Sequence, residues 1–343
     1  MLKMKVADLS KLFGRVSENE TVYLPVDTKE GASFKKYEDG MVMSEAFNTT
    51  RSAKDFFFPQ VENIVDFKVD GKKIEILDTH EAVKDFVIFG VRACDVKSFE
   101  ILDRVYLLQQ PVDQFYKERR DHATIVSLAC QKPQETCFCH VFDDIDAGNP
   151  KGDVTSWIFG DEIFFKANTE KGEKLIASVK DLLTEGDDKP VEDSKAAVKF
   201  MLDRLPIKDI KLNELSKMEL LEKFNAPVWE ELAEACLGCG TCTFNCPTCQ
   251  CYDVREFNTG KEIKRFRCWD SCMYKDFTQM AAENSRHTHM QRFRQRFMHK
   301  LVYYPENNEG IYMCVGCGRC LRSCPIHMNI VKVAKALGGE KNE

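Results

Sequence analysis

Two short stretches of the chain, CLGCGTCTFNCP at residues 236–247 and CVGCGRCLRSCP at residues 314–325, decide the fold of its C-terminal part. Each stretch places four cysteines and a proline in the spacing C-x2-C-x2-C-x3-C-P. Three thiols at three-residue intervals can wrap one face of a metal–sulfur cubane, and the fourth thiol then points away. The glycines inside each stretch let the backbone approach the sulfurs closely, and the proline fixes the local turn. The chain therefore contains an internal repeat suited to binding metal.

This spacing is the one that bacterial two-cluster ferredoxins use for [4Fe–4S] clusters, where the fourth cysteine ligates the other cluster. The crossed pattern predicts two four-cysteine sites: Cys236, Cys239, Cys242 and Cys324 (cluster 1), and Cys314, Cys317, Cys320 and Cys246 (cluster 2). Structural zinc is the alternative, but zinc sites normally take two C-x2-C pairs or include histidines. The repeat therefore favours iron–sulfur clusters over a zinc-stabilised interaction module.

Eight of the sixteen cysteines lie outside this pattern. Cys94 follows one predicted strand, and Cys130, Cys137 and Cys139 follow another. Ends of neighbouring strands bring together residues that are distant in sequence, so these four could hold a third cluster. The alternative for Cys94 is a small thiol buried in the core.

The other four cysteines, Cys249, Cys251, Cys268 and Cys272, follow the first repeat. They could bind a fourth cluster or line the first two, although a C-x-C segment next to Cys246 is crowded. An enzyme with chemistry at a cluster near Cys249 and Cys272 is a further alternative. Such an enzyme needs an open iron, because catalytic metal sites keep a vacant position, and the crossed pattern leaves none open.

The composition fits an ordinary globular protein of two domains, with 343 residues, 43% hydrophobic and 30% charged. A net charge of −6 argues against nucleic acid as a partner. The longest apolar runs, such as residues 86–91, are too short to span a membrane, and the N-terminus does not resemble a secretory signal. We expect a cytoplasmic protein whose cysteines bind metal rather than form disulfides.

The predicted fold class is α+β, with a mixed α/β domain at residues 1–190 and a mainly helical domain with a ferredoxin-like module at residues 191–343. The segment TEGDDKPVED (184–193) has the composition of a linker. Pro25 is expected to end the first strand. The runs that predict strands lie at 21–24, 86–89 and 124–128, and those that predict helices lie at 96–108, 173–183 and 213–224.

A basic stretch, RHTHMQRFRQRFMHK (286–300), predicts an amphipathic helix with Phe293 and Phe297 facing inward. Its cationic side chains could meet solvent, or could stabilise the reduced state of nearby anionic clusters. The sequence contains no G-x-G-x-x-G and no P-loop, so we predict no flavin or nucleotide on this chain.

Several motifs together resemble one family, the A subunit of anaerobic sulfite reductase and the related β (iron–sulfur) subunit of cytoplasmic sulfhydrogenases. The similarity extends over nearly the whole chain. The motifs are NTTRSAKDFFFPQ (48–60), GVRACD (90–95), FYKERR (115–120), CPTCQCYD (246–253), WDSCM (269–273) and CVGCGRC (314–320). The motifs NTTRSAKDFFFPQ and GVRACD are more similar to the sulfhydrogenase branch of the family.

The resemblance implies a non-catalytic electron-transfer subunit of an oxidoreductase complex. It would accept electrons from a flavin subunit that oxidises NAD(P)H and pass them to a catalytic subunit, a sirohaem sulfite reductase or a nickel–iron hydrogenase. It also favours a third cluster at the set Cys94, Cys130, Cys137 and Cys139. Cys268 departs from the family pattern, which weakens the case for a fourth cluster ligated by four cysteines.

Overall fold

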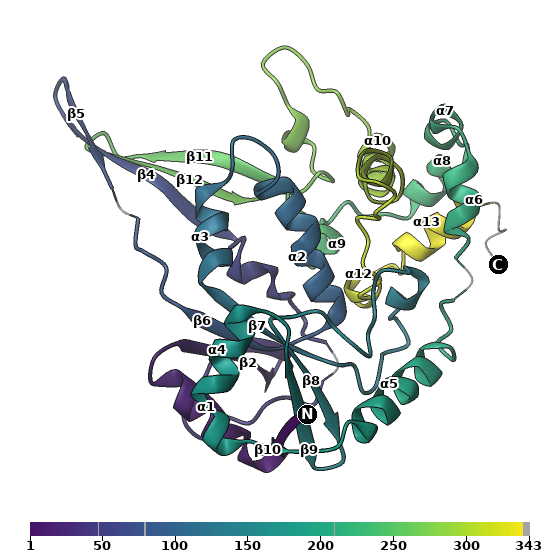
Figure 1. The fold of residues 1–343 in the computed structure, drawn as a ribbon. Helices are drawn as coiled ribbons and strands as arrows, with labels where there is room; N and C mark the ends of the chain where they lie inside the picture. The colour runs from purple at the N-terminus through teal and green to yellow at the C-terminus, as the bar shows by residue number, and fades with distance from the viewer. Residues whose placement is uncertain (47, 79, 209, 339–343) are drawn as a thin grey trace. The chain divides into compact units, whose positions relative to one another are not determined.

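A computed structural model describes residues 1–338 except 47, 79 and 209, and the chain divides into two compact units (Figure 1). Unit 1 consists of Met1–Ala53, Lys84–Ile210 and Cys314–Arg319, and unit 2 of Lys54–Val83, Lys211–Met313 and Cys320–Glu343. This division differs from the predicted boundary at residue 190, because each unit is assembled from segments that are distant in the sequence. None of the helices in the described part of the chain is long and apolar enough to span a membrane.

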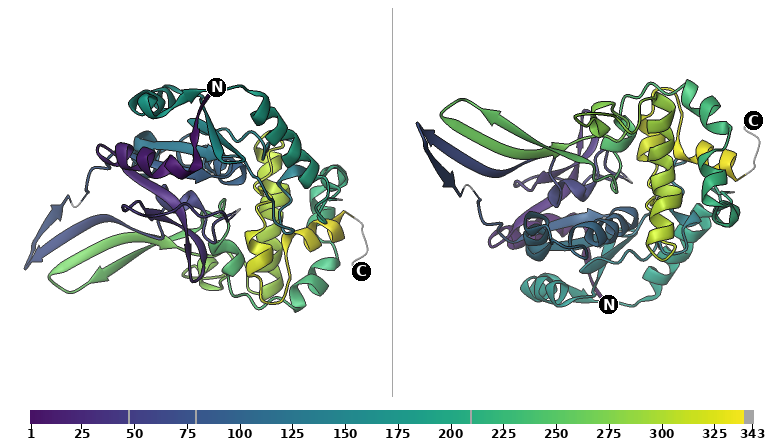
Figure 2. Two further views of the ribbon diagram at one scale, coloured as in Figure 1. Left: turned by 90° about the horizontal axis from the view of Figure 1, so that it is seen from below. Right: turned by 90° about the horizontal axis from the view of Figure 1, so that it is seen from above.

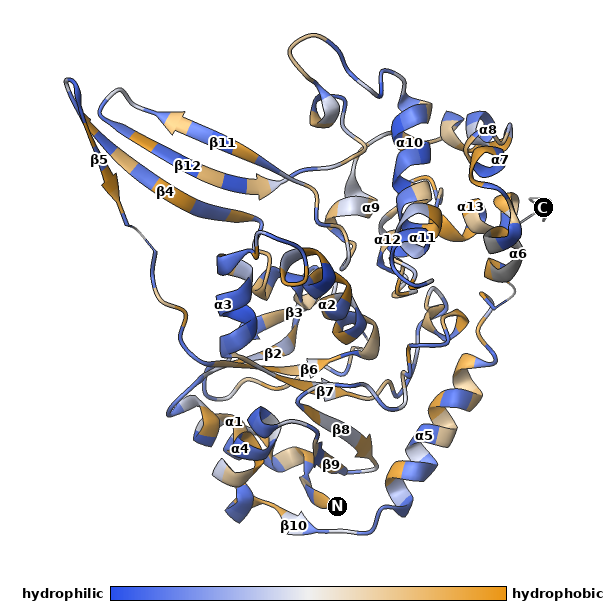
Figure 3. Cartoon of the chain, turned by 45° about the horizontal axis from the view of Figure 1, so that its top comes forward, coloured by the Kyte–Doolittle hydropathy of each residue, from blue (hydrophilic) through white to orange (hydrophobic). Residues whose placement is uncertain are grey.

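Unit 1 is built on an eight-stranded sheet in which β2, β6, β7 and β8 pair in parallel and the remaining pairs are antiparallel. In spatial order the strands are β10 (Thr184–Glu185), β1 (Leu2–Lys5), β9 (Glu162–Ala167), β8 (Val154–Phe159), β7 (Ala123–Leu128), β6 (Phe86–Val91), β2 (Thr21–Thr28) and β3 (Gly31–Lys36). Every residue of β6 and β7 is buried, as expected for central parallel strands. Both strands are coloured hydrophobic in Figure 3.

Helices cover both faces of this sheet. On one face α1 (Leu9–Ser17) and α4 (Glu170–Ser178) enclose the main core, which includes Phe13, Phe89 and Phe165. On the other face lie α2 (Ala93–Tyr106) and α3 (Gln114–His122), as Figures 1 and 3 show. α5 (Lys189–Leu202) packs against β8.

The predicted strands correspond to β2, β6 and β7, and the predicted helix at 96–108 corresponds to α2. Pro25 does not end β2, which continues to Thr28. The parallel pairing with β6 covers only Thr21–Tyr23, whereas the pairing with β3 continues through Pro25. The proline therefore lies beyond the pairing with β6, on a stretch of strand that tolerates a missing N–H.

The segment 184–193 is not a simple linker. It forms β10 and then the first turn of α5, where Pro190 occupies a position whose N–H has no partner within a helix. Val191 is fully buried against Trp157 and Phe164. The predicted domain boundary at residue 190 thus falls inside a helix that belongs to unit 1.

Unit 2 contains a four-stranded antiparallel sheet that the sequence did not predict (Figure 2). In spatial order it consists of β11 (Tyr252–Asn258), β12 (Glu262–Trp269), β4 (Val61–Asp70) and β5 (Lys73–Leu77). β11 and β12 are rich in charged residues and mostly exposed, so their sequence gives a weak strand signal. The C-terminal segment is thus mainly helical, as predicted, but it also contributes two strands, and β12 pairs with a hairpin from the N-terminal half.

The helices of unit 2 are short, and the predicted helix at 213–224 is interrupted between α6 and α7. The longest, α10, corresponds to the predicted amphipathic helix, and its Phe293 packs edge-on against Trp229 of α8 at 6.3 Å. Their bounds are α6 (Leu212–Lys217), α7 (Leu220–Phe224), α8 (Val228–Glu234), α9 (Thr241–Phe244), α10 (His289–Met298), the π-helix η6 (His299–Tyr303), α11 (Tyr304–Asn307) and α13 (Ile330–Leu337). The helix α12 (Arg319–Ser323) crosses from unit 1 into unit 2.

Candidate metal centres

The four cysteines predicted for cluster 1 lie around one small cavity of unit 2, of about 30 Å³. Cys236, Cys239 and Cys242 come from the first repeat, and Cys324 comes from the end of the second. Apolar side chains, among them Phe293, close the remaining walls. The structure therefore brings together the crossed set that the ferredoxin spacing predicts.

The local backbone explains how the first repeat exposes its sulfurs. Gly238 and Gly240 both adopt positive φ angles, 65° and 74°, which favour glycine. The N–H of Gly238 donates to the Cys236 sulfur at 3.4 Å. A side chain at Gly240 would collide with the hydroxyl of Tyr274, which donates to the Cys239 carbonyl at 3.1 Å. The loop is thus shaped for backbone N–H groups to approach a cluster, as in other iron–sulfur sites.

The four cysteines predicted for cluster 2 are divided between the units. Cys314 and Cys317 belong to unit 1, and Cys320 and Cys246 belong to unit 2. The Cys246 and Cys249 thiols are close enough that each shifts the pKa of the other, lowering that of Cys246 and raising that of Cys249.

The Cys314–Arg319 segment of unit 1 packs directly on the segment that contains Cys137 and Cys139. The N–H of Phe138 donates to the carbonyl of Gly316 at 2.8 Å. Gly316 has a φ of 58°, and a β-carbon there would lie 2.4 Å from the backbone nitrogen of Cys139. The second repeat therefore needs glycine at residue 316 to make this close contact.

The set Cys94, Cys130, Cys137 and Cys139 comes together within unit 1. Cys94 lies in the first turn of α2 after β6, and Cys130 follows β7, so both occupy the carboxyl ends of adjacent parallel strands. Ligands of open α/β sheets bind at such ends. The Cys139 thiol interacts electrostatically with those of Cys130, Cys137 and Cys317, and the Cys94 thiol interacts with Cys139 and Cys317.

The charge environment of this set matters because clusters bind thiolates. Burial raises the pKa of Cys94, Cys130 and Cys139. Two arginines oppose this effect: Arg92 lowers the pKa of Cys130, and Arg319 lowers that of Cys94. A metal deprotonates the thiols that coordinate it, so iron together with these arginines would stabilise thiolates here.

A buried ion pair joins three of the motifs from which the family resemblance was inferred. Arg319 of the second repeat donates from both Nη atoms to the Asp95 carboxylate, at 2.7 Å each, and from Nε to the carbonyl of Thr49 at 2.9 Å. Asn48 in turn donates to the carbonyl of Cys317 at 3.3 Å. Asp95 follows Cys94 directly and Arg319 is two residues after Cys317, so the pair joins the segments that carry these two cysteines. Asp95 and Arg319 belong to the motifs GVRACD and CVGCGRC, but nothing in their local sequence indicates that they pair.

Three of the remaining cysteines gather in unit 2. The Cys251 thiol raises the pKa of Cys272, and the Cys249 thiol also raises it, so the three thiols lie near one another. Cys268 lies on β12, paired across the sheet with Asp253. In the described part of the chain, no three His, Cys, Asp or Glu side chains converge tightly enough for a single metal ion. A cubane spreads its thiolates more widely, because each binds a different iron.

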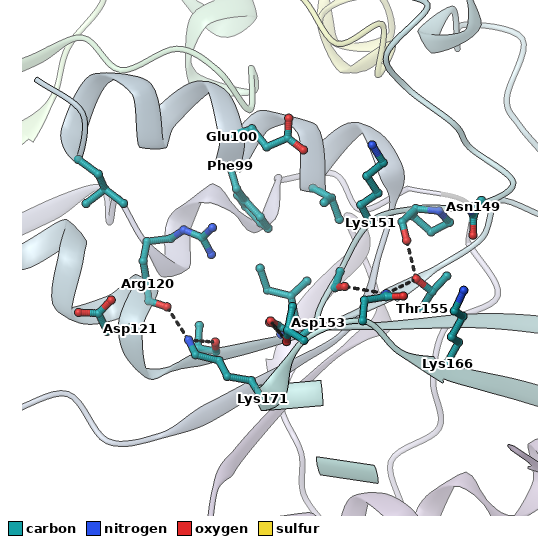
Figure 4. Close-up of a pocket in the computed structure, with 18 residues that line it drawn as sticks. Phe99, Glu100, Arg120, Asp121, Asn149, Lys151, Asp153, Thr155, Lys166 and Lys171 are labelled. Atoms are coloured by element: carbon teal, nitrogen blue, oxygen red, sulfur yellow. Dashed lines mark hydrogen bonds between the residues drawn. The ribbon is translucent and has the colours of Figure 1, made fainter. Parts of the chain in front are cut away.

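A separate polar cavity of about 560 Å³ lies in unit 1 (Figure 4). None of the described residues that line it is a cysteine. Asp153 accepts from the N–H of Ile125 at 2.8 Å and from the hydroxyl of Thr169 at 2.7 Å, and Lys171 donates to two backbone carbonyls. Through these bonds Asp153 and Lys171 hold the local backbone in place, which gives both a structural role. The cysteine sets therefore remain the candidate metal sites.

Comparison with known proteins agrees with the cysteine geometry. Residues 235–328 match the family model of the 4Fe-4S dicluster domain, a range that includes the eight cysteines of the two repeats. This part of the chain is thus a 4Fe-4S dicluster domain, which supports iron–sulfur clusters as the cofactors. The whole chain is 32% identical over 326 residues to the sulfhydrogenase 2 subunit beta of Pyrococcus furiosus, covering 94% of each chain. The chain therefore belongs to the sulfhydrogenase β-subunit family, which confirms the family resemblance and a role in iron–sulfur electron transfer. The helices and sheets of the structure confirm the α+β class.

Proposed function

We propose that this chain is the subunit that relays electrons between an NAD(P)H-oxidising flavin subunit and a catalytic subunit, a hydrogenase or a sulfite reductase. The observation that supports this proposal most is that one cavity is lined by all four cysteines predicted for cluster 1: Cys236, Cys239, Cys242 and Cys324. The relative's name describes a subunit of a sulfhydrogenase, which favours a role within a complex.

The proposed cofactors are two [4Fe–4S] clusters in the predicted crossed sets and a third at Cys94, Cys130, Cys137 and Cys139, with no flavin on this chain. Each cluster would supply one-electron transfer. With four cysteines on each cluster, every iron is coordinated and no position is open to a substrate. The glycine loops hold the sulfurs in place, and apolar walls such as Phe293 exclude water.

The packing inside unit 1 supports electron flow between neighbouring centres. Gly316 and Cys317 of the second repeat lie against Phe138 and Cys139. Ligands proposed for clusters 2 and 3 are therefore neighbours, which would allow direct exchange between the two centres.

An iron–sulfur enzyme with chemistry near Cys249 and Cys272 is a second candidate, favoured by one observation. Three cysteines outside the crossed sets, Cys249, Cys251 and Cys272, are close together and at least partly buried. Three protein ligands would leave one iron open to a substrate.

The relay predicts that the chain depends on a flavin partner. A hydride donor delivers two electrons together, whereas a cluster accepts one, so a flavin must stand between them. The anaerobically purified, flavin-free chain should bleach rapidly with dithionite but not with NADH or NADPH in stopped-flow absorbance. Adding a flavoprotein reductase with its nucleotide should restore the bleaching. Rapid reduction by either nucleotide alone would contradict the relay.

A further inference from the structure

We propose that Arg296 is a positioning residue that fixes the Cys242 sulfur and raises the reduction potentials of clusters 1 and 2. This inference rests on the proposed cluster sites. It goes beyond them by naming one cation among the several in the basic stretch at 286–300 and by assigning it a measurable effect.

The helix α10 holds Arg296 in place. A capping box formed by Thr288 and Gln291 fixes the start of the helix, and Phe293 and Phe297 anchor one face in the core. Arg296 is directed inward with them and is only 2% exposed. Its position is therefore determined by the same packing that forms the core of unit 2.

The guanidinium contacts a predicted cluster ligand directly. Its Nε donates to the Cys242 sulfur at 3.0 Å, and its Nη2 donates to the Cys242 carbonyl at 2.8 Å. Two bonds from one planar group to the same residue fix the direction of that sulfur, which a lysine could not reproduce. Arg296 also lines the cavity surrounded by the first cysteine set.

The charge of Arg296 needs compensation that the described protein atoms do not fully supply. Its Nη1 is buried and has no hydrogen-bond partner among the described residues. The groups that favour its charged form are thiols, those of Cys242, Cys249, Cys320 and Cys246 in order of effect. Arg319 of unit 1, by contrast, is paired with a carboxylate. A buried cation without a carboxylate is costly, so an anionic centre at these cysteines would explain it.

The surrounding thiols belong to both predicted clusters. Cys242 is assigned to cluster 1, and Cys246 and Cys320 to cluster 2. An all-cysteine [4Fe–4S] cluster is anionic, and reduction adds one more negative charge. A fixed cation nearby therefore stabilises the reduced form and raises the potential. The effect should be larger at cluster 1, because its ligand also accepts the N–H···S bond.

The test compares three variants of the full chain by EPR-monitored redox titration. R296Q removes the charge of the side chain. R296K keeps the charge but cannot make both hydrogen bonds to Cys242. R294Q removes an equal charge from the same helix, where Arg294 donates to the carbonyl of Phe224 at 3.0 Å. We expect R296Q to lower the ratio of reduced to oxidised cluster 1 at least about tenfold at a fixed potential, which is a fall of about 59 mV in the reduction potential for one electron. R296K should lower the reduction potential of cluster 1 less than R296Q does, and R294Q should leave that potential at the wild-type value.

Iron and sulfide content is measured on every variant first. If R296Q assembles no clusters, R296K decides the question: a lowered potential or an altered cluster 1 signal supports the inference, and wild-type behaviour overturns it. Unchanged potentials in a fully loaded R296Q, or an equal shift in R294Q, also overturn it. A wild-type chain without iron and sulfide would instead refute the proposed function.

Discussion

The buried pair between Asp95 and Arg319 gives the sharpest test of how unit 1 holds its cysteines. The change D95N keeps the shape of the side chain but removes the negative charge. Both side chains are almost completely buried, at 2% and 1% exposed. The variant therefore leaves the Arg319 guanidinium in the interior without its carboxylate.

Breaking a buried ion pair by removing one partner costs about 3–5 kcal/mol. The lower end applies here, because the amide oxygen of asparagine can still accept one bond and nearby clusters would share the charge. About 3 kcal/mol is a large part of the roughly 5–15 kcal/mol by which a domain is stable. Since Arg319 also binds Thr49 and follows Cys317 closely, the loss should loosen the second repeat where it meets the third cysteine set.

The assay is anaerobic urea unfolding, followed both by cluster absorbance and by tryptophan fluorescence. D95N should unfold at a lower urea concentration and lose iron sooner than the wild type. The matched control is D103N, which disrupts a similar bidentate pair with Arg120 that is only partly buried. This control should lower stability less and retain its iron. Wild-type midpoints and iron content in D95N would refute the structural role of the pair.

Three further predictions concern individual residues. The double change C137S/C139S should remove about four irons and one paramagnetic signal, because serine is a poor ligand for iron–sulfur clusters; unchanged iron would show that neither residue is a ligand. G316A should disrupt the contact with Cys139, since its β-carbon would meet backbone at 2.4 Å and the φ is positive, so iron retention should fall; iron retention equal to the wild type would contradict this. K54M should lower the free energy of unfolding by about 1.5–3 kcal/mol, because the buried ammonium of Lys54 donates to the carbonyls of Cys246 and Cys249. An unchanged midpoint of urea unfolding would contradict this.

The set Cys236, Cys239, Cys242 and Cys324 was predictable, because the spacing of the two repeats determines which cysteines can reach one cluster. The sequence also located the central strands of unit 1, whose apolar runs are continuous. The alternation of charged and apolar residues in β4 and β12 is itself a strand signal, but the sheet of unit 2 was not predictable, because β12 pairs with β4 from the other half of the chain. Local periodicity gives no information about such a distant partner.

The individual roles of charged residues were also beyond the sequence. Asp95 and Arg319 are separated by 224 positions, so only the fold reveals their pairing. The basic stretch at 286–300 offers several equivalent cations, and the packing of Phe293 and Phe297 decides that Arg296 is the one that meets a cysteine sulfur.

The central claim, that this chain binds [4Fe–4S] clusters at the predicted cysteines, is tested most directly by counting iron and acid-labile sulfide after anaerobic reconstitution. With four irons per cluster, the two crossed sets require about eight irons and the third site raises the total to about twelve, with sulfide in equal amount. We predict about twelve of each per chain. Fewer than about eight irons, or stoichiometric zinc without sulfide, would contradict the account.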